Sequence, residues 1–596
     1  MWLGYTASST CVWRGSPISR KSAELHITSE PLDDIPVIVR WLADMQVAPI
    51  MDAVLPTPHG NRTGLTYGQL AVGYLTFVLS ECDHRISYVE DWARQRQRVL
   101  TWQLRSPVRD KDFTDDRLED LLRRLGDSER RPWEALDEQL GQHLIAAYDL
   151  PTDAGRVDST TVSVYHGPPH PEQTVLKFGH SKDHRPDLRQ FMQQLGTLDP
   201  AGIPLITQTL AGNSAEDPHY LPAWQRMVHI LGRADWLLIA DSKFSSLANQ
   251  AQVQAGGGFY LAPIPMKGHI PELFREWVLH PPARVQRISV DGVPQGGCQG
   301  FEVSVPQEWV NPEMVEGVTA PVRWEQRMLL VWRQSYADTQ VQALHERLAR
   351  AAHDVQALAR TPFEQAETLP DAIQAILERH RVTDFMRAAP RWTVSHSQKY
   401  VGAGRPGPKR QTRQVEEHRL RIDIRYREPV IQEAEQLAGW RLYGTNAPPT
   451  RLSLRQAVNL YGDQWQPERG FHRLKGRPLG IAPVFLHDEA CLRGLMVLMG
   501  IALRVLTLAE FVVRRQLALN HEALAGLYEG NPGRQTSQPT TERLLKAFAG
   551  IVLYGYRLDR EWHYQISALS KLQKHLLKLM KLPANLYAVP EEIDSS

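Results

Sequence analysis

Residues 155 to 265 alternate between strand and helix patterns, and this alternation restricts the fold more than any other feature of the sequence. Strand patterns rich in valine, threonine and leucine come first, in "GRVDSTTVSV" and in "LRQFMQQLGTLDPAGIPLITQTLAG", which a Pro/Gly turn divides in two. The helix pattern "DPHYLPAWQRMVHILG" then precedes the buried strand "DWLLIAD", and a further helical stretch precedes "GFYLAPIP". This order predicts a mixed α/β sheet.

The 596 residues are too many for one hydrophobic core, so several units are expected. Residues 1–30 carry little pattern and predict a loose tail. Residues 31–150 hold helix patterns such as "DIPVIVRWLADM" and "DDRLEDLLRRLG" and predict an all-helical N-terminal domain. The strand and helix alternation follows in residues 151–265, the first part of the sheet domain.

The pattern changes again after residue 265. Strand-like segments, a long helix pattern and the basic Gly/Pro-rich loop "VGAGRPGPKRQTRQ" predict an insertion over residues 266–435. The sheet pattern resumes in "GWRLYGTN", so residues 436–520 are expected to be the second part of the sheet domain. Residues 521–596 predict a helical C-terminal region, ending in the basic amphipathic segment "LSKLQKHLLKLMKLP".

Composition limits the classes of function. With 68 basic and 67 acidic residues the net charge is +1, which argues against a polycation that coats nucleic acid, so any basic binding surface must be local. The four cysteines lie far apart, without metal-binding or redox spacing, as expected in a reducing cytoplasm. The apolar run "LMVLMGIALRVLTLAEFVV" contains Arg504 and Glu510 and predicts a buried helix, not a membrane span. We therefore expect a cytoplasmic protein.

Two carboxylates stand at unusual places in the predicted sheet. Asp158 lies inside the first strand, where aspartate is depleted, and Asp241 directly follows the buried strand "WLLIA". In open α/β sheets, sites gather at the carboxyl ends of strands. Each residue also has a plainer interpretation, since Asp158 could satisfy a backbone turn and Asp241 could cap the next helix.

A third carboxylate belongs to the segment "YGDQWQPERGFHRLKGRP", residues 461 to 478. On one continuous helix Tyr461, Gln464, Glu468 and Lys475 would share an arc of roughly 60°. Pro467 interrupts that assumption, because an interior proline removes a hydrogen bond and kinks a helix. The alternative is a helix that begins near Pro467, with Tyr461 and Gln464 in the preceding turn.

If the three carboxylates of Asp158, Asp241 and Glu468 converge, they form a site of hard oxygen ligands. Unneutralised, they would repel one another, and two Mg²⁺ ions would remove that repulsion. A two-metal site is suited to phosphodiester chemistry. A solvated Glu468 is the plainer alternative. The nearby "FGHSKDHRPD" lacks Cys ligands, so we interpret it as a polar loop and not as a zinc site.

The segments "VDST" and "ADSKF", the spacing Y-x2-Q-x3-E-x6-K and the strand order resemble DDE transposases of bacterial insertion sequences, in the insertion sequence four superfamily. "HSKDHRPDLRQ" and "ERGFHRLKGRPL" are most similar to its sixteen-thirty-four branch. The resemblance covers about residues 30 to 585. It implies an α/β fold with an RNase H-like mixed-sheet catalytic core, which a β-rich insertion interrupts. An all-helical N-terminal domain precedes this core, and a helical C-terminal part follows it.

The resemblance also implies roles for individual residues. Asp158, Asp241 and Glu468 would be the catalytic ligands of two Mg²⁺ ions, with Mn²⁺ as a substitute. Tyr461 and Lys475 would contact DNA phosphates. The remaining members of the expected DNA-binding set are Gln464, Arg473, Lys182 and Arg185. Gln464 stands where the family signature usually has arginine, so a charge-assisted contact becomes a neutral one.

The expected partners are the terminal inverted repeats of a transposon and its target DNA, bound by a homodimer, with the helical N-terminal domain as a candidate for DNA-end binding. The expected activity is cut-and-paste transposition, in which metal-dependent cleavage at the transposon ends is followed by strand transfer of the 3′ hydroxyl. Two alternatives stay open. One is an RNase H-like nuclease without strand transfer, and the other is a catalytically decayed DNA-binding protein, suggested by Gln464 and Pro467.

Overall fold

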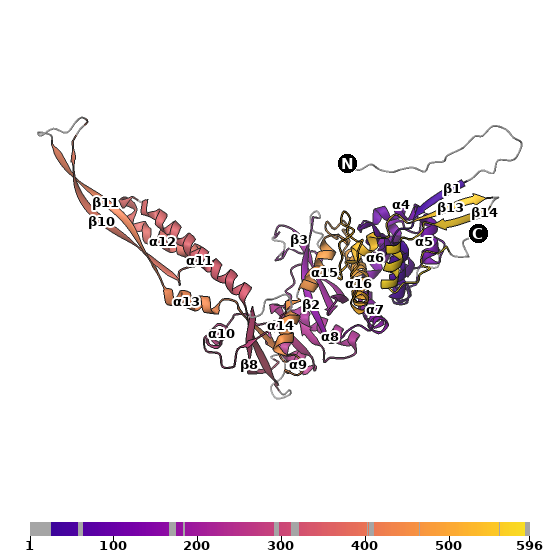
Figure 1. Ribbon diagram of the computed structural model, residues 1–596, viewed down its shortest axis with the longest axis horizontal. Coiled ribbons are helices and arrows are strands. Elements are labelled where there is room, and N and C mark those ends of the chain that lie inside the picture. The colour runs from indigo at the N-terminus through magenta and orange to yellow at the C-terminus, as the bar shows by residue number, and fades with distance from the viewer. Residues whose placement is uncertain are drawn as a thin grey trace. The chain divides into compact units, whose positions relative to one another are not determined.

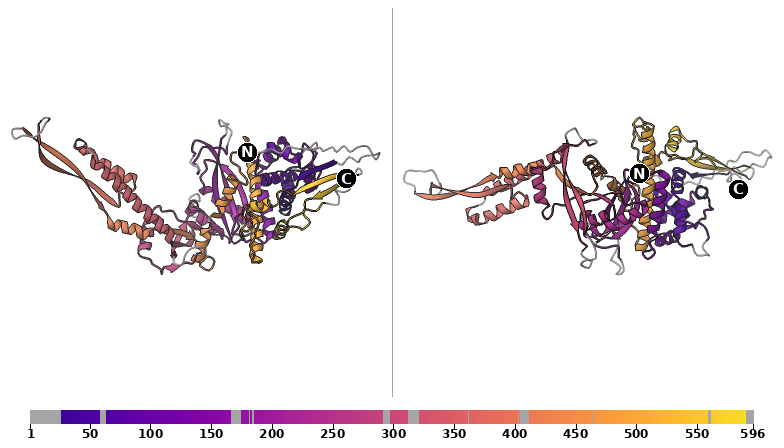
Figure 2. Two further views of the ribbon diagram at one scale, coloured as in Figure 1. Left: turned by 45° about the horizontal axis from the view of Figure 1, so that its top comes forward. Right: turned by 90° about the horizontal axis from the view of Figure 1, so that it is seen from below.

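The computed structural model describes residues 26–57, 63–165, 174–180, 182, 185–290, 297–311, 321–360, 362–401, 403, 411–463, 465–558 and 561–589. The chain divides into two compact units, each built from segments distant in the sequence (Figures 1 and 2). The first unit comprises Met1–His143, Val164–Pro169 and Arg473–Ser596. The second comprises Leu144–Ser163 and His170–His472.

The N-terminal half of the first unit is helical, as the pattern predicts. Its helices are α1 (Ile35–Asp44), α2 (Val47–Val54), α3 (Tyr67–Glu81), α4 (Val89–Arg94), α5 (Gln97–Leu104), α6 (Asp115–Leu125) and α7 (Pro132–Tyr148). α3 begins at a capping box, in which the Thr66 hydroxyl accepts from the Gln69 N–H and the Gln69 side chain accepts from the Thr66 N–H. Nearly every side chain of α3 up to Leu79 is buried, so this helix lies in the core of the unit.

Helix α16 (Glu489–Leu519) is long and apolar enough to span a membrane by length and composition, but 94% of its most apolar window is buried inside the protein. The two charges inside its apolar run are both paired. Arg504 forms a buried ion pair with Asp137 of α7, and Glu510 pairs with Arg473 and with Arg514. α16 therefore has the surroundings of a core helix.

The chain termini of the first unit form a small sheet that the sequence did not suggest. β1 (His26–Pro31) pairs antiparallel with β13 (Val552–Leu558), which pairs in turn with β14 (Glu561–Ile566). The expectation of a loose tail is therefore wrong for residues 26–30, and residues 1–25 lie outside the described part. In the described part of residues 521–596 the helices are α17 (Thr541–Lys546) and α18 (Lys571–Leu579), and the helical expectation is wrong for β13 and β14.

The second unit is built on a nine-stranded mixed sheet in the order β4-β3-β2-β5-β6-β12-β9-β8-β7. The strands are β2 (Ala154–Val164), β3 (Arg189–Leu198), β4 (Ile203–Ala211), β5 (Leu237–Ile239), β6 (Phe259–Pro263), β7 (Gln286–Arg287), β8 (Cys298–Trp309), β9 (Val322–Arg333) and β12 (Trp440–Thr445). β5 pairs parallel with both β2 and β6, whereas β12 pairs antiparallel with β6 and β9. With α8 (Tyr220–Leu231) and α9 (Leu247–Ala255), the predicted order of strands and helices up to β6 is confirmed.

The predicted insertion is only partly separate from this sheet. β8 and β9 extend the sheet beyond β12, because β9 pairs with β12 over Trp440–Thr445. The interpretation of residues 266–435 as one inserted domain is therefore wrong for these strands. The other domain boundaries remain a prediction.

Residues 334–437 form a substructure with its own core. It contains α11 (Gln334–Ala357), α12 (Leu369–Arg379), α13 (Glu428–Leu437) and the hairpin of β10 (Met386–Tyr400) and β11 (Thr412–Tyr426). The hairpin lies along α11 and α12 (Figure 1). Its apolar cluster includes Leu348 and Val355 of α11, Leu377 of α12, Met386 of β10 and Ile422 of β11.

Close packing of α6 against α16 generates a test of the first unit. A Cβ at Gly494 of α16 would lie 1.9 Å from the Leu122 carbonyl oxygen of α6. Alanine favours helices by about 1 kcal/mol over glycine, but overpacking costs roughly 1–3 kcal/mol. We expect Gly494→Ala to lower the thermal unfolding midpoint, with Gln516→Ala on the same helix as a near-neutral control. A raised midpoint would contradict the packing.

Asp34 makes the stability of the first unit depend on pH. Burial raises the pKa of its carboxyl from 3.8 to about 6, although the Ser80 hydroxyl donates to it at 2.6 Å. The folded state therefore holds this proton more tightly than the unfolded chain, so stability present below pH 3.8 is lost as pH rises through about 6.

The variant Asp34→Asn keeps an oxygen acceptor for Ser80 and has no proton to lose. Its free energy of unfolding, relative to the unmodified protein, should rise between acid and neutral pH by up to about 3 kcal/mol. Chemical denaturation across that range measures the difference. A difference that is constant with pH would contradict the assignment.

Candidate active site

The pairing of two neighbouring strands brings Asp158 and Asp241 together. β2 and β5 run parallel with Arg156 opposite Ile239. Continued by two residues, the same register sets Asp158 level with Asp241, which follows the end of β5. Neighbouring strands lie about 4.8 Å apart, so the two carboxyl groups are within direct electrostatic reach.

The environment of Asp158 is unfavourable to its negative charge. Burial raises the pKa of its carboxyl to about 7. The Lys182 ammonium and the Ser159 N–H lower this pKa, whereas the charges of Asp241 and Glu216 raise it further. Burial is therefore the main reason why the ionised form of Asp158 is disfavoured, and the nearby carboxylates add to it.

Asp241 is held by two donors on one oxygen. The Tyr220 hydroxyl donates to Asp241 Oδ1 at 2.6 Å, and the Lys243 N–H donates to the same atom at 2.8 Å. Burial and the neighbouring Asp241 raise the pKa of Tyr220, so its hydroxyl keeps the proton that it donates. Asp158 is held similarly, because its Oδ1 accepts from the Ser159 N–H at 2.7 Å. One oxygen of each carboxylate is therefore fixed by the protein.

The plainer interpretations of these two residues are also observed. Asp158 bonds to the backbone of the next residue, and Asp241 caps the short 3₁₀ turn Ser242–Phe244. Capping uses only Oδ1, however, so it does not exclude a ligand role for the second oxygen. The two interpretations are compatible.

Sequence reasoning missed Glu216 and Tyr220. Glu216 forms an ion pair of 3.0 Å with Lys182, whose ammonium also donates to the Ser159 carbonyl at 2.6 Å. Tyr220 opens α8, after the 3₁₀ turn Asp217–His219 where the sequence predicted the start of the helix. No spacing in the sequence links these residues to Asp158. Only the strand order could have indicated them.

The segment that begins at Tyr461 is two helices, and the single continuous helix is wrong. α14 (Leu454–Gly462) ends before the segment's proline, and α15 (Trp465–Lys475) carries Pro467 in its first turn, where the missing N–H has no helical partner to lose. Tyr461 therefore lies in the last turn of α14, where its ring packs on Tyr443 of β12 at 4.6 Å between centroids. Gln464 lies outside the described residues.

Arg156 ties the end of α14 to the strand that carries Asp158. Its guanidinium donates to both oxygens of Asp199 and, at 2.6 Å, to the Leu460 carbonyl oxygen in the last turn of α14. Both charged side chains are almost fully buried. Breaking such a pair would leave an uncompensated buried charge, so the end of α14 is held in place beside β2.

Glu468 lies in the first turn of α15, with an exposed side chain. Among the residues that the structure describes, no three His, Cys, Asp or Glu side chains gather as a preformed metal site. The structure thus brings Asp158 and Asp241 together, and the convergence of Glu468 with them stays a prediction.

The residues that were expected to bind DNA have different surroundings in the structure. Arg473 is buried and pairs with Glu510 and, at 2.8 Å, with Glu542, both in the first unit. This burial argues against a DNA contact by Arg473, and its DNA-binding role stays a prediction. Arg185 pairs at 2.6 Å with Asp187 on the surface. Lys475 ends α15, and Lys182 stands beside Asp158.

The donor set of Asp158 and Asp241 fits divalent cations of the Mg²⁺ type. Both ligands are hard carboxylate oxygens, each with one oxygen atom that no described residue engages. Besides burial, the negative charges of Asp241 and Glu216 raise the pKa of Asp158, so added positive charge would stabilise the ionised carboxylates. A divalent cation would supply that charge.

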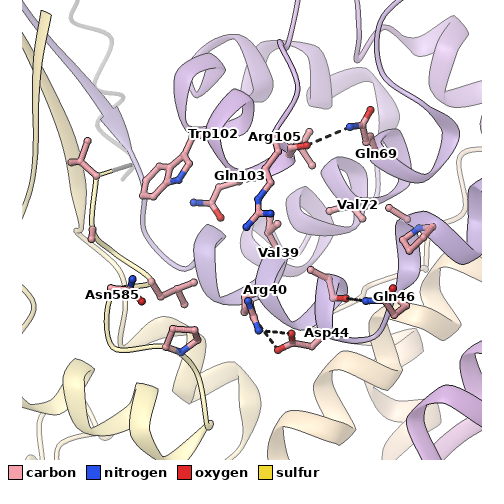
Figure 3. A pocket seen from close by; sticks show the side chains of 18 residues that line it. Val39, Arg40, Asp44, Gln46, Gln69, Val72, Trp102, Gln103, Arg105 and Asn585 are labelled. Atoms are coloured by element: carbon pink, nitrogen blue, oxygen red, sulfur yellow. Dashed lines mark hydrogen bonds and ion pairs between the residues drawn. The ribbon is translucent and has the colours of Figure 1, made fainter. Parts of the chain in front are cut away.

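The first unit contains a separate pocket of about 980 Å³. Figure 3 shows Arg40 paired with Asp44 on one side and the Gln69 side chain donating to the Leu104 carbonyl on another. None of the predicted catalytic or DNA-binding residues lines it. We assign this pocket no part in the chemistry.

The comparison with protein families agrees with the geometry. The family model of the transposase DDE domain matches residues 150–504, more than half of the 596-residue chain. No curated protein matches the chain. The family match spans the elements that carry Asp158, Asp241 and Glu468. The chain therefore belongs to the DDE transposase family.

Proposed function

We propose that the protein is a cut-and-paste DNA transposase, which cleaves the ends of a transposon and joins the freed 3′ hydroxyl to target DNA. The observation that carries this proposal is the pair of Asp158 and Asp241 on neighbouring parallel strands, within a chain whose family acts on DNA. We further propose that the mixed sheet is an RNase H-like core and that the protein belongs with the transposases of bacterial insertion sequences, in the insertion sequence four superfamily.

Asp158, Asp241 and Glu468 are the proposed ligands of two Mg²⁺ ions, which Mn²⁺ can replace. When bound, such a pair of ions activates an attacking oxygen and stabilises the leaving oxygen of a phosphodiester. Glu468 completes the set if α15 presents its exposed carboxylate to the strand pair. Its position in the first turn of α15 would leave that carboxylate accessible to a cation or to DNA.

The other residues bind and orient. Tyr220 and the Lys243 N–H fix one oxygen of Asp241, and no described residue donates to the other oxygen. Lys182, Arg185, Tyr461, Gln464 and Lys475 are the proposed phosphate contacts. Lys182 is the best supported of these, because its ammonium already lies beside Asp158.

Two reactions are proposed in sequence. In the first, a water oxygen bonds to the phosphorus at the transposon end, and the bond from phosphorus to the 3′ oxygen breaks, leaving a 3′ hydroxyl and a 5′ phosphate. In the second, that 3′ hydroxyl oxygen bonds to a target phosphorus and displaces a 3′ oxygen, so one phosphodiester replaces another. A dimer on paired ends is the proposed assembly.

A nuclease without strand transfer is the second candidate, since the same carboxylates could hydrolyse DNA and release it. Supplying the protein with pre-cleaved ends separates the two proposals. Joined products support a transposase, and hydrolysis alone supports a nuclease. An unmodified protein that binds ends but never cleaves with Mg²⁺ or Mn²⁺ would favour a decayed DNA-binding protein.

Replacing Asp241 tests the cleavage step. Asp241→Asn keeps the acceptor for Tyr220 but removes the charge that attracts a cation. Cleavage of transposon-end DNA should fall roughly a thousandfold or more, because metal ions supply several kcal/mol of transition-state stabilisation. Binding of the same DNA in EDTA should persist. Glu468→Gln should lose cleavage to the same extent as Asp241→Asn. If Glu468→Gln cleaves at the rate of the unmodified protein, Glu468 is not a metal ligand.

Replacing Tyr220 tests its role as a positioning residue. Tyr220→Phe removes one donor to Asp241, so the affinity for Mn²⁺, measured by calorimetry without DNA, should fall about tenfold. The buried Tyr260 of β6, whose hydroxyl accepts from Trp324 Nε1 at 3.0 Å, gives the matched control Tyr260→Phe. Equal Mn²⁺ affinities in the two variants would argue against the positioning role.

A further inference from the structure

The hairpin of β10 and β11 gathers its positive charge on one face. Its register is unbroken from Met386 opposite Tyr426 to Tyr400 opposite Thr412. Side chains of directly paired residues point to the same face, and alternate residues along a strand share it. All seven lysine and arginine residues of the two strands fall on the odd-numbered face: Arg387, Arg391, Lys399, Arg413, Arg419, Arg421 and Arg425. We call this the basic face.

The opposite face of the hairpin is the one that packs. Met386 and Ile422 are buried there, and Leu420 and Ile424 pack against the same cluster with residues of α11 and α12. Every one of the seven cations on the basic face is exposed. The helices therefore fix the hairpin so that its basic face is turned to solvent.

The basic face carries like charges in direct opposition. Arg387 lies opposite Arg425, Arg391 opposite Arg421, and Lys399 opposite Arg413. Like charges at directly paired positions destabilise a sheet. Sheet stability alone does not account for three such pairs in one hairpin.

Carboxylates on the same face neutralise only part of this charge. Asp423 lies 3.3 Å from Arg421 and 3.9 Å from Arg391, and Glu417 lies 2.6 Å from Lys399. In the described part of the chain, Arg387, Arg413, Arg419 and Arg425 have no carboxylate partner. The face thus presents seven cations against two anions.

We propose that the basic face of the β10–β11 hairpin binds the phosphate backbone of duplex DNA. Strands of 15 residues extend about 50 Å at 3.3 Å per residue, and duplex DNA carries one negative charge per about 1.7 Å. A two-stranded ribbon also fits the major groove, which is about 12 Å wide. The proposal takes DNA as the partner from the proposed function and does not depend on the carboxylate chemistry.

The test is DNA binding by the full chain in EDTA, where no cleavage intervenes. Fluorescence anisotropy with a labelled duplex of about 20 base pairs, long enough for the ribbon, gives the slope of log affinity against log salt. The double variant Arg387→Gln/Arg425→Gln should lower that slope by about 2, one per lost phosphate contact. Its unfolding midpoint should stay the same or rise, because a repulsive pair is gone.

The matched control removes two arginines from α11, which covers the other face of the hairpin. Arg347→Gln/Arg350→Gln should leave the salt slope unchanged. Lys399→Gln/Arg413→Gln, outside the buried cluster, repeats the test should the first double variant unfold. Equal salt slopes for the hairpin variants and the α11 control would overturn the proposal. Binding by the unmodified protein that does not depend on salt would overturn it too.

The substitution Arg387→Glu sharpens the test. It places opposite charges across the strands, so hairpin stability should rise while DNA affinity falls. Polyglutamate serves as a competitor and is compared with unlabelled duplex DNA at equal concentrations of negative charge. If polyglutamate displaces the labelled DNA as well as the duplex does, the partner is an acidic protein and the proposal is overturned. Asp241→Asn separates this proposal from the proposed function, because it should lose cleavage while its salt slope stays that of the unmodified protein.

Discussion

The parallel pairing of β2 with β5 is the constraint on which the candidate site depends. Parallel strands need a long crossover between them, and here the crossover contains β3, β4 and α8. That same crossover contributes Glu216 and Tyr220 to the surroundings of the two aspartates. One topological feature therefore supplies both the carboxylate pair and the groups that hold it, although these residues are spread over more than 80 positions of the chain.

A buried charge pair connects β2 with α14, the helix that precedes α15 and its Glu468 in the chain. Arg156 precedes Asp158 by two residues, so both side chains lie on the same face of β2. Arg156 donates to Asp199 at the β3–β4 turn and to the last turn of α14. Buried ion pairs are weak evidence for stability but can fix one arrangement among several. In this fold, the pair links the turn, the strand and the helix junction.

Sequence patterns predicted the parts of this fold that depend on local periodicity. The helices of residues 31–150, the strands β2 to β6 and the burial of α16 follow from hydrophobic spacing, which short segments determine by themselves. The β1–β13 pairing and the extension of the sheet by β8 and β9 join distant segments, and one sequence holds no signal for such pairing. The helix break before α15 was visible because Pro467 restricts the backbone locally. The burial of Arg473 was not, because its partners Glu510 and Glu542 lie on other helices.

Because one sequence does not show how distant segments pair, the basic face of the hairpin could not be predicted from the sequence. A net charge of +1 over the chain conceals it, and the seven cations lie in two segments separated by the loop. Even spacing of the cations within each segment shows only that each strand has a basic side. Whether the two basic sides coincide depends on the register, since a slip by one residue would turn one strand's cations to the apolar face. Packing of Met386 and Ile422 with α11 and α12 prevents that slip, so the hydrophobic core of this substructure is what keeps the positive charges together.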